Sequence, residues 1–399
     1  MTRPLIPGAI PGEAALRVTV SDVVDFAALE AKWRDLETRS DPSFFQSWTW
    51  TGCLAEERFP NPVLVEARED GRTVALALFN RRGGTLYLGE SGDPALDCVY
   101  IEHNGVLAEA GREASLTAAC LQAARAASGG WPGLADFGKL AARGRHWGKP
   151  RLVLGGVRAE TAVAAAAAGV VLCNRSLSAP LADLAPPDHC FLDGRSANTR
   201  QQLRRSERAY AASGDIAVER AGTLSQSLAF LDGLTALHQA SWTGRGKPGA
   251  FANPFFGRFH RMLIERGLRR GEIDLLHVAA GSQTIGFLYN FRHRGHSLAY
   301  QSGFDYAGAS GHGKPGLTCH LEAIGFAARS GAVLYDFLAG DDRYKRSLSD
   351  RAETLHWIEV ACPYSPRILA RRTWDFMTGA LRPKGRPGVT AYASWRRAP

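Results

Sequence analysis

The sequence predicts a mixed α/β fold in which two similar units follow one another along the chain. Of the 399 residues, 45% are hydrophobic and 22% are charged, which is typical of a chain that buries cores. Each half shows the same order of elements: two helices, an antiparallel meander of short strands, a further helix and a strand. Tight turns join the meander strands, so a doubly wound parallel sheet is excluded.

In the first half, apolar side chains recur at helical spacing over residues 26–36 and predict an amphipathic helix. A segment rich in aromatic residues follows at 44–54. Strands expected at 62–67 and 73–80 flank the turn sequence Glu-Asp-Gly, which is a strong hairpin signal. A third strand, at 85–89, completes the first meander.

The second half repeats this order. Leu231, Leu234 and Leu237 lie on one helix face, and Asn253-Pro254 supplies an N-cap and a first-turn proline for the next helix. Strands are expected at 272–280, 284–292 and 297–305. A glycine-rich loop at 308–316 then leads into a helix from Leu317, and buried strands are expected at 333–338 and 354–361.

We expect an N-terminal unit at residues 14–183 and a C-terminal unit at 188–365, with a proline-containing linker at 179–187. Residues 366–399 form a basic tail that accounts for +7 of the net charge of +9. This tail is expected to be a packed helix with a solvated end, or a weak tether to an anionic membrane surface. We do not expect DNA as a partner.

Several other protein classes are excluded. The seven cysteines are widely spread and the eleven histidines lack metal-like spacing, so we expect no disulfide framework and no metal. His293 and His296 are expected in an exposed turn. The longest small-apolar run, at 162–173, is too short for a membrane span of ~20 residues, and the first residues do not resemble a signal peptide. A cytoplasmic location is therefore expected.

The glycine loop is the first candidate site. Its glycines let backbone amides approach a ligand, and the first turn of the following helix presents unpaired N–H groups to an anion such as a pyrophosphate. Lys314 could add a positive charge. The alternative is a flexible connector. The candidate donor-binding residues are Gly311, Gly313, Lys314, Gly316, Leu317 and Thr318.

The second candidate is the segment from Asp336 to Lys345, where a buried strand leads into a loop dense in ionisable side chains. Lys345 could stabilise a developing oxyanion, and Asp336 could orient a nucleophile or act as a base. The alternative is a surface network of charges. A third candidate is a helix at 198–212, on which Arg200 and Arg204 share one face and suit a phosphate, or are simply solvated.

These segments together carry a family resemblance. The sequence Tyr300-Gln301-Ser302-Gly303-Phe304-Asp305, the helix start at Pro315-Gly316, and Tyr335-Asp336-Phe337 followed by Gly340 and Tyr344-Lys345 resemble the GNAT-type acyltransferases of cellulose and exopolysaccharide biosynthesis (the CelD-like family). That family is related to the Fem-type aminoacyl transferases. Phe44-Phe45-Gln46-Ser47, Trp50, Asp97 and Tyr100 add to the likeness, which covers residues 16–361.

The resemblance implies two tandem GNAT-like domains, with acyl-CoA bound by the second and no metal required. It implies Lys345, Tyr344 and Asp336 as catalytic residues, and Asp97, Tyr100, Arg200, Arg204 and Tyr300 on the side of the acceptor. The first half lacks a comparable glycine loop, which suggests that it binds no nucleotide donor. It would instead line one side of the acceptor site, with Asp97 as a possible base. The usual Gln/Arg-x-x-Gly-x-Gly/Ala signature is absent, and Gly-His-Gly-Lys-Pro-Gly stands in its place at 311–316.

The expected function is therefore transfer of an acyl group from acyl-CoA to an amine or hydroxyl of a sugar or cell-envelope precursor. Two alternatives stay open. One is a Fem-type transferase that uses aminoacyl-tRNA, and the other is a non-catalytic component of a polysaccharide-synthesis complex.

Overall fold

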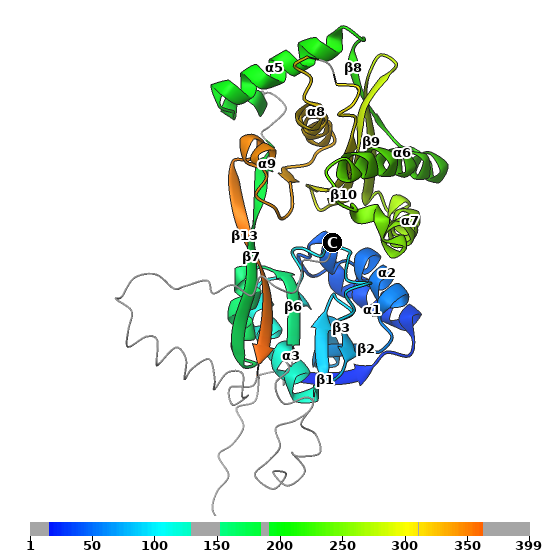
Figure 1. Cartoon of the computed structure of the whole chain (residues 1–399). Coiled ribbons are helices and arrows are strands. Elements are labelled where there is room, and N and C mark those ends of the chain that lie inside the picture. The colour runs from blue at the N-terminus through cyan, green and yellow to red at the C-terminus, as the bar shows by residue number, and fades with distance from the viewer. Residues whose placement is uncertain (1–15, 129–151, 185–190, 310, 362–399) are drawn as a thin grey trace, which may run out of the picture.

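A computed structural model describes residues 16–128, 152–184, 191–309 and 311–361, and Figure 1 shows that they form two lobes. The first lobe comprises β1 (Arg17–Asp22), α1 (Phe26–Glu37), α2 (Trp48–Arg58), β2 (Pro62–Glu69), β3 (Arg72–Arg82), β4 (Thr85–Leu88), β5 (Leu107–Ala108), α3 (Glu113–Ala127), β6 (Leu152–Val157) and α4 (Ala159–Ala165). The second lobe comprises α5 (Ala197–Ala211), β8 (Ile216–Arg220), α6 (Leu224–Thr243), α7 (Pro254–Leu268), β9 (Ile273–Ala280), β10 (Gln283–His293), β11 (His296–Phe304), α8 (Pro315–Arg329), β12 (Leu334–Asp336) and α9 (Arg343–Leu348). The long strands β7 (Val170–Asp183) and β13 (Arg351–Ala361) join the two lobes.

The described strands form one mixed sheet. Its order is β1-β2-β3-β4-β6-β13-β7-β12-β11-β10-β9-β8, and β5 pairs with β3. Among these strands, β4–β6 and β11–β12 are the parallel pairs, and each belongs to one lobe. The predicted mixed α/β fold, with a mostly antiparallel sheet flanked by helices in two similar units, is confirmed.

Local sequence explains several elements. Asp70 and Gly71 both adopt positive φ, 49° and 79°, which the tight turn between β2 and β3 requires. The Asn253 side chain accepts a hydrogen bond from the Phe255 amide and begins α7, with Pro254 in the first turn. The second meander forms as β9, β10 and β11, close to the predicted bounds.

The predicted linker at 179–187 is wrong in its first part, because residues 179–183 are the end of β7. Pro180 argued against a strand there, yet β7 runs between β12 and β13 and both neighbours hold it in the sheet. β13 comes from the C-terminal half of the chain but pairs with β6 of the first lobe as well as with β7. The basic tail lies outside the described residues.

One aromatic core spans both lobes. Phe44 stacks on Phe291 with ring centroids 4.2 Å apart, and Trp50 lies edge-on to Tyr300 at 5.9 Å. Phe44 and Trp50 belong to the first lobe, whereas Phe291 and Tyr300 lie on β10 and β11. All four side chains are buried, so this packing fixes the two lobes against each other. Within the described ranges, no helix is long and apolar enough to cross a bilayer.

Candidate functional site

The site forms where β11 and β12 part. The two parallel strands pair from His296–Leu334 to Leu298–Asp336, and the pairing then stops. Beyond Asp336 the chain follows β7 instead, because the Phe337 amide donates to Pro180 O at 3.0 Å and the Gly340 amide to Ser178 O at 2.8 Å. The loop 337–340 is thus carried away from β11 at the seam between the lobes.

Lys345, in α9, holds this loop from one side. Its Nζ donates to the carbonyl oxygens of Leu338 at 3.2 Å and Ala339 at 3.0 Å. The side chain is buried, and burial lowers the pKa of Lys345, although the charges of Glu102, Asp342 and Asp336 oppose that effect. An ammonium has three donors, so these two bonds do not exhaust it.

Glu102 of the first lobe holds the same loop from the other side. Its Oε2 accepts the amide hydrogen of Ala339. The Ala339 residue is therefore bound at its N–H by Glu102 and at its carbonyl by Lys345. Glu102 is buried, and burial raises its pKa above the usual value, although the Ala339 amide and the charge of Lys345 oppose that rise.

A second contact between the lobes lies directly beside the first. His103 Nε2 is 2.8 Å from Asp336 Oδ2, and both side chains are almost fully buried. Burial alone would lower the pKa of His103, but the charge of Asp336 outweighs it and the pKa is raised. Burial would also raise the pKa of Asp336, but His103 and the Leu338 amide together lower it. The pair therefore favours the ionised carboxylate of Asp336 and makes His103 easier to protonate than an ordinary histidine.

Asp336 also sets the backbone of the loop. Its Oδ1 accepts the Leu338 amide hydrogen at 2.7 Å, and Leu338 has a φ of 58°, in the left-handed region. A leucine is rarely found there, so the surrounding bonds must hold it. Glu102, His103 and Asp336 together fix the carbonyl groups that Lys345 contacts.

Beside this network lies a cavity of about 300 Å³. It is lined by charged side chains from both lobes and from the joining strands, and Arg158 Nε lies 3.2 Å from His103 Nδ1 at its wall. The lining includes His103, Arg158, Asp183, His296, Asp336, Arg351 and Glu353. In the described part of the chain, no group of three or more His, Cys, Asp or Glu side chains is placed to hold a metal ion.

The structure therefore brings Lys345 and Asp336 together and places the other predicted catalytic residue, Tyr344, on a different face of α9. The Tyr344 ring stacks on His320 of α8, with centroids 5.0 Å apart, and burial raises the pKa of its hydroxyl. Tyr300 and Tyr100 also meet, because the Tyr300 hydroxyl donates to Tyr100 O at 3.4 Å.

Asp97 has a different environment. Its carboxylate accepts from the amides of Ser91 and Gly92, both at 2.8 Å, and from the Ser91 hydroxyl at 2.9 Å. It also lies 3.3 Å from Nη1 of Arg58, whose side chain is completely buried. Asp97 thus fixes a loop and neutralises a buried cation, and its oxygens are already engaged by the protein.

The predicted donor-binding residues surround the start of α8. Pro315 brings no N–H, and the Lys314 amide donates to Ser206 Oγ of α5 at 2.8 Å. Ser206 Oγ also lies 2.7 Å from the hydroxyl of Thr318. The amides of Gly316 and Leu317 have no acceptor one turn earlier in the helix, so they are the groups that could bind an anion. Gly311 has a positive φ of 56°, and Gly313 follows it toward the helix.

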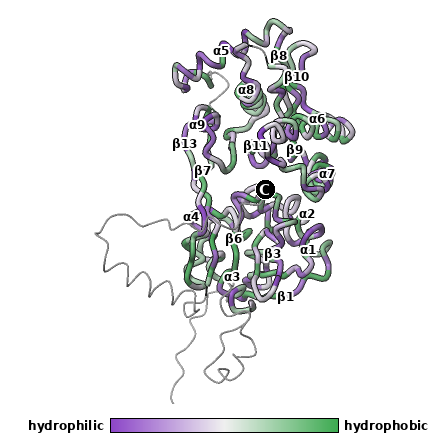
Figure 2. Tube along the Cα trace, in the orientation of Figure 1, coloured by the Kyte–Doolittle hydropathy of each residue, from purple (hydrophilic) through white to green (hydrophobic). Residues whose placement is uncertain are grey.

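The arginines of α5 differ in their surroundings. Arg200 Nη1 donates to the carbonyl oxygens of Arg195 and Asp193, whereas the Arg204 side chain is exposed. Figure 2 shows that hydrophilic residues prevail along α5. Because Ser206 of the same helix contacts α8, α5 carries its arginines alongside the start of α8.

In the first lobe, the equivalent place between β4 and β6 is filled. The Asn104 side chain donates to Leu88 O of β4 at 3.0 Å and to Gly155 O of β6 at 3.1 Å. A Cβ on Gly156 would lie 2.2 Å from the carbonyl oxygen of Ile101, so the loop before Asn104 also packs tightly there. A side chain thus bridges the parallel strands of the first lobe.

Sequence reasoning missed Glu102 and His103. They lie two and three residues after Tyr100, which was already singled out, and they begin a polar run Glu-His-Asn after the apolar residue Ile101. Three buried polar residues in a loop are unusual and signal a network. Their partners, however, are about 240 residues away in sequence.

Comparison with known proteins agrees with this geometry. Residues 197–346, from α5 into α9, match the family model described as an acetyltransferase (GNAT) domain. No curated protein matches the chain.

Among solved structures, FemX is similar over 86% of this chain and 97% of its own, with a TM-score of 0.52 and 10% identity. The C-terminal domain of a putative lysylphosphatidylglycerol synthetase from Agrobacterium fabrum is similar over 88% and 98%, with a TM-score of 0.50 and 12% identity. A conserved protein of unknown function from Bacteroides thetaiotaomicron is similar over 86% of this chain and 100% of its own, with a TM-score of 0.50 and 10% identity. At these identities the likeness shows the fold alone.

Proposed function

We propose that the protein is an acyltransferase that moves an acyl group from acyl-CoA to an amine or hydroxyl of a sugar or cell-envelope precursor. The observation that carries the proposal is a pair of hydrogen bonds to the backbone of Ala339, at the point where β11 and β12 diverge. Glu102 accepts from the Ala339 amide, and Lys345 donates to the Ala339 carbonyl oxygen. The match of residues 197–346 to an acetyltransferase domain supports the class of reaction. The acceptor class rests on the sequence resemblance.

In this reaction the acceptor nitrogen or oxygen forms a bond to the thioester carbonyl carbon, and the carbon–sulfur bond then breaks. The acceptor gives up a proton and the sulfur leaves as a thiolate, which is protonated to the free thiol. Negative charge develops first on the carbonyl oxygen. A hydrogen-bond donor that is already held next to that oxygen stabilises the transition state, because the protein does not have to reorganise during the reaction.

Lys345 is the proposed donor to this oxygen, since its ammonium is buried and two of its three hydrogens are already fixed by carbonyl groups. Glu102 is the proposed base, because burial raises its pKa above the usual value, which makes it a stronger base, and it lies at the same loop. His103 and Asp336 are positioning residues in this scheme, acting through the Leu338 amide.

The donor's pyrophosphate would bind at the Gly316 and Leu317 amides, with Lys314 and the α5 arginines supplying positive charge. Thermal unfolding with acetyl-CoA, longer acyl-CoAs and free coenzyme A tests this. An acyl-CoA at about one hundred times its Kd should stabilise the protein by about 2.7 kcal/mol. Absence of stabilisation by every acyl-CoA would remove the proposed donor.

An aminoacyl-tRNA donor is the second candidate. It is favoured by the crowded start of α8. There the Ser206 hydroxyl oxygen accepts a hydrogen bond from the Lys314 amide, and the side chains of Phe304 and Tyr306 lie against Gly316. In that case charged tRNA, and not acyl-CoA, raises the unfolding temperature. If neither ligand does so, and Lys345→Met changes no measurable activity, a non-catalytic role replaces both.

A further inference from the structure

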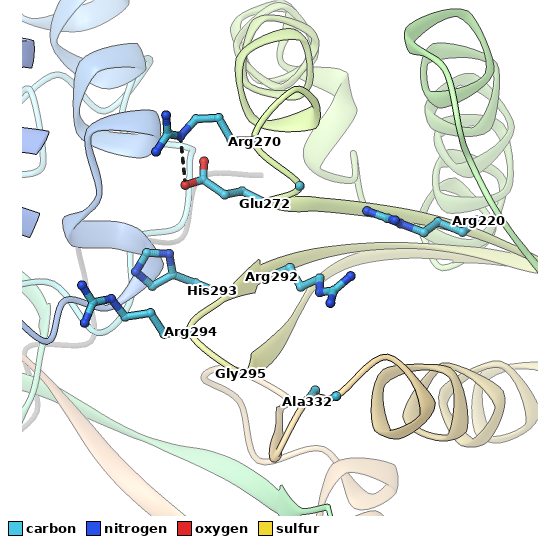
Figure 3. A pocket seen from close by; sticks show the side chains of 10 residues that line it. Arg220, Arg270, Glu272, Arg292, His293, Arg294, Gly295 and Ala332 are labelled. Carbon is cyan, nitrogen blue, oxygen red and sulfur yellow. Dashed lines mark hydrogen bonds and ion pairs between the residues drawn. The ribbon is translucent and has the colours of Figure 1, made fainter. Parts of the chain in front are cut away.

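A second cavity, of about 470 Å³, lies beside the turn between β10 and β11 and the end of α8 (Figure 3). β11 starts at this turn and ends at Phe304, shortly before the glycine loop. The cavity and the proposed donor site therefore lie at opposite ends of β11. Four arginines from four segments line it, namely Arg220, Arg270, Arg292 and Arg294, together with Glu272 and His293.

The arginines are only partly neutralised. Arg220 Nε lies 2.6 Å from Asp274 Oδ1, and Arg270 Nε lies 3.3 Å from Glu272 Oε1. Arg292 has no carboxylate within 4 Å among the described residues, and its Nη2 donates to the carbonyl of Ser330 at 3.0 Å.

Arg294 pairs at 3.5 Å with Asp41, whose side chain is 81% exposed, so water and salt weaken that pair. Glu272 is the one acid of the lining, and the Thr49 hydroxyl donates to its other oxygen. The cavity therefore presents an excess of positive charge.

His293 adds an unsatisfied polar atom rather than charge. The prediction of an exposed turn is wrong for this residue, because its ring is half-buried and burial lowers its pKa to about 4. The imidazole is thus neutral at neutral pH. Its Nε2 is buried without a hydrogen-bond partner in the described part of the chain, and the ring adds no positive charge to the cavity, so the positive charge there comes from the arginines alone.

We infer that this cavity binds a phosphate-bearing anion. Guanidinium groups match phosphate geometry, and a phosphate offers several acceptor oxygens to donors that come from different directions, whereas a carboxylate offers two in one plane. The volume suits a small ligand. The inference does not depend on the proposed function, because no residue of the transfer site lines this cavity.

Calorimetric titration with inorganic phosphate, pyrophosphate and glycerol phosphate tests it at fixed ionic strength, and the cavity variants below distinguish this site from the proposed donor site. We expect one site per chain. Arg292→Gln, and separately the double variant Arg270→Gln with Arg294→Gln, should each weaken the binding about tenfold or more. The matched control is Arg269→Gln, an exposed neighbour outside the cavity, which should bind as the wild type does.

Tighter binding of glycerol phosphate would identify an organic phosphate as the source, and tighter binding of the inorganic ions would identify free phosphate or pyrophosphate. Arg270 and Arg294 are both exposed, so their variant keeps the test valid if Arg292→Gln fails to fold. The inference is wrong if none of the three anions binds below about 10 mM, or if Arg269→Gln weakens binding as much as the cavity variants do.

Discussion

His103 Nε2 lies 2.8 Å from Asp336 Oδ2. This buried contact joins the first lobe to the last residue of β12, directly before the loop that Lys345 binds. The same carboxylate fixes the Leu338 amide. Through these bonds the first lobe controls the backbone of a loop in the second. Both lobes therefore contribute side chains to the network around this loop.

Lys345→Met should lower kcat by about 100-fold or more, because it removes a fixed donor to the developing oxyanion while keeping the apolar stem. Steady-state kinetics with the acyl-CoA that stabilises the protein measure the loss, and circular dichroism checks the fold. The matched control is Arg346→Met, since Arg346 is an exposed neighbour in α9 that pairs with Asp341. Unchanged turnover in Lys345→Met would exclude Lys345 from the mechanism.

His103→Gln should reduce the free energy of unfolding by roughly 3 kcal/mol, because it removes the partner of the buried Asp336 carboxylate. The pKa of His103 is raised in the fold, so its contribution is fully present below the ordinary histidine value of about 6.5 and is lost as pH rises through the folded value. The pKa of Asp336 is lowered, so its contribution is lost as pH falls below about 4.

The stability difference between wild type and His103→Gln is thus largest between about pH 4 and 6.5 and shrinks at higher pH. Urea unfolding across this range measures it. His312→Gln, which alters an exposed histidine of the glycine loop, should show no such profile. A difference that grows from pH 6 to 9 would contradict the assignment of the pair.

Asn104→Ala should destabilise the protein by about 1–3 kcal/mol, because the carbonyl groups of Leu88 and Gly155 lose a buried donor. Donor affinity should stay within about twofold, since Asn104 fills the first lobe and the proposed donor binds the second. Chemical denaturation and a donor titration give both values, with the exposed Asn174→Ala as control. If Asn104→Ala changed the number of donor molecules bound per chain relative to the wild type, the first lobe would have to bind a donor.

Asp97→Asn separates two roles for that residue. If Asp97 holds a loop and neutralises buried Arg58, the substitution should lower the free energy of unfolding by about 3 kcal/mol and change kcat less than tenfold. A general base should instead cost about 100-fold or more in kcat. Kinetics below the unfolding temperature decide between them, and Asp93→Asn, in the same loop, is the matched control.

Much of the fold could be predicted from local sequence. The Glu-Asp-Gly turn, the Asn253-Pro254 helix start and the strands of the second meander are set by residues close together in the chain, and their structure follows the prediction. The end of β7 does not, because Pro180 is a local signal against a strand and two neighbouring strands override it.

The sequence by itself determined the β2–β3 turn, the start of α7 and the strands of the second meander, and it marked Asp336 and Lys345 as ionisable groups in a segment that begins as a buried strand. Only the tertiary structure decided that Glu102 and His103 meet them. The reason is that strand order in the sheet is set by long-range pairing: β7 and β13 cross between the lobes, and the aromatic contact of Phe44 with Phe291 closes the seam. Partners so far apart in the chain leave no periodic signal, because periodicity reports a residue's own helix or strand and not what packs against it.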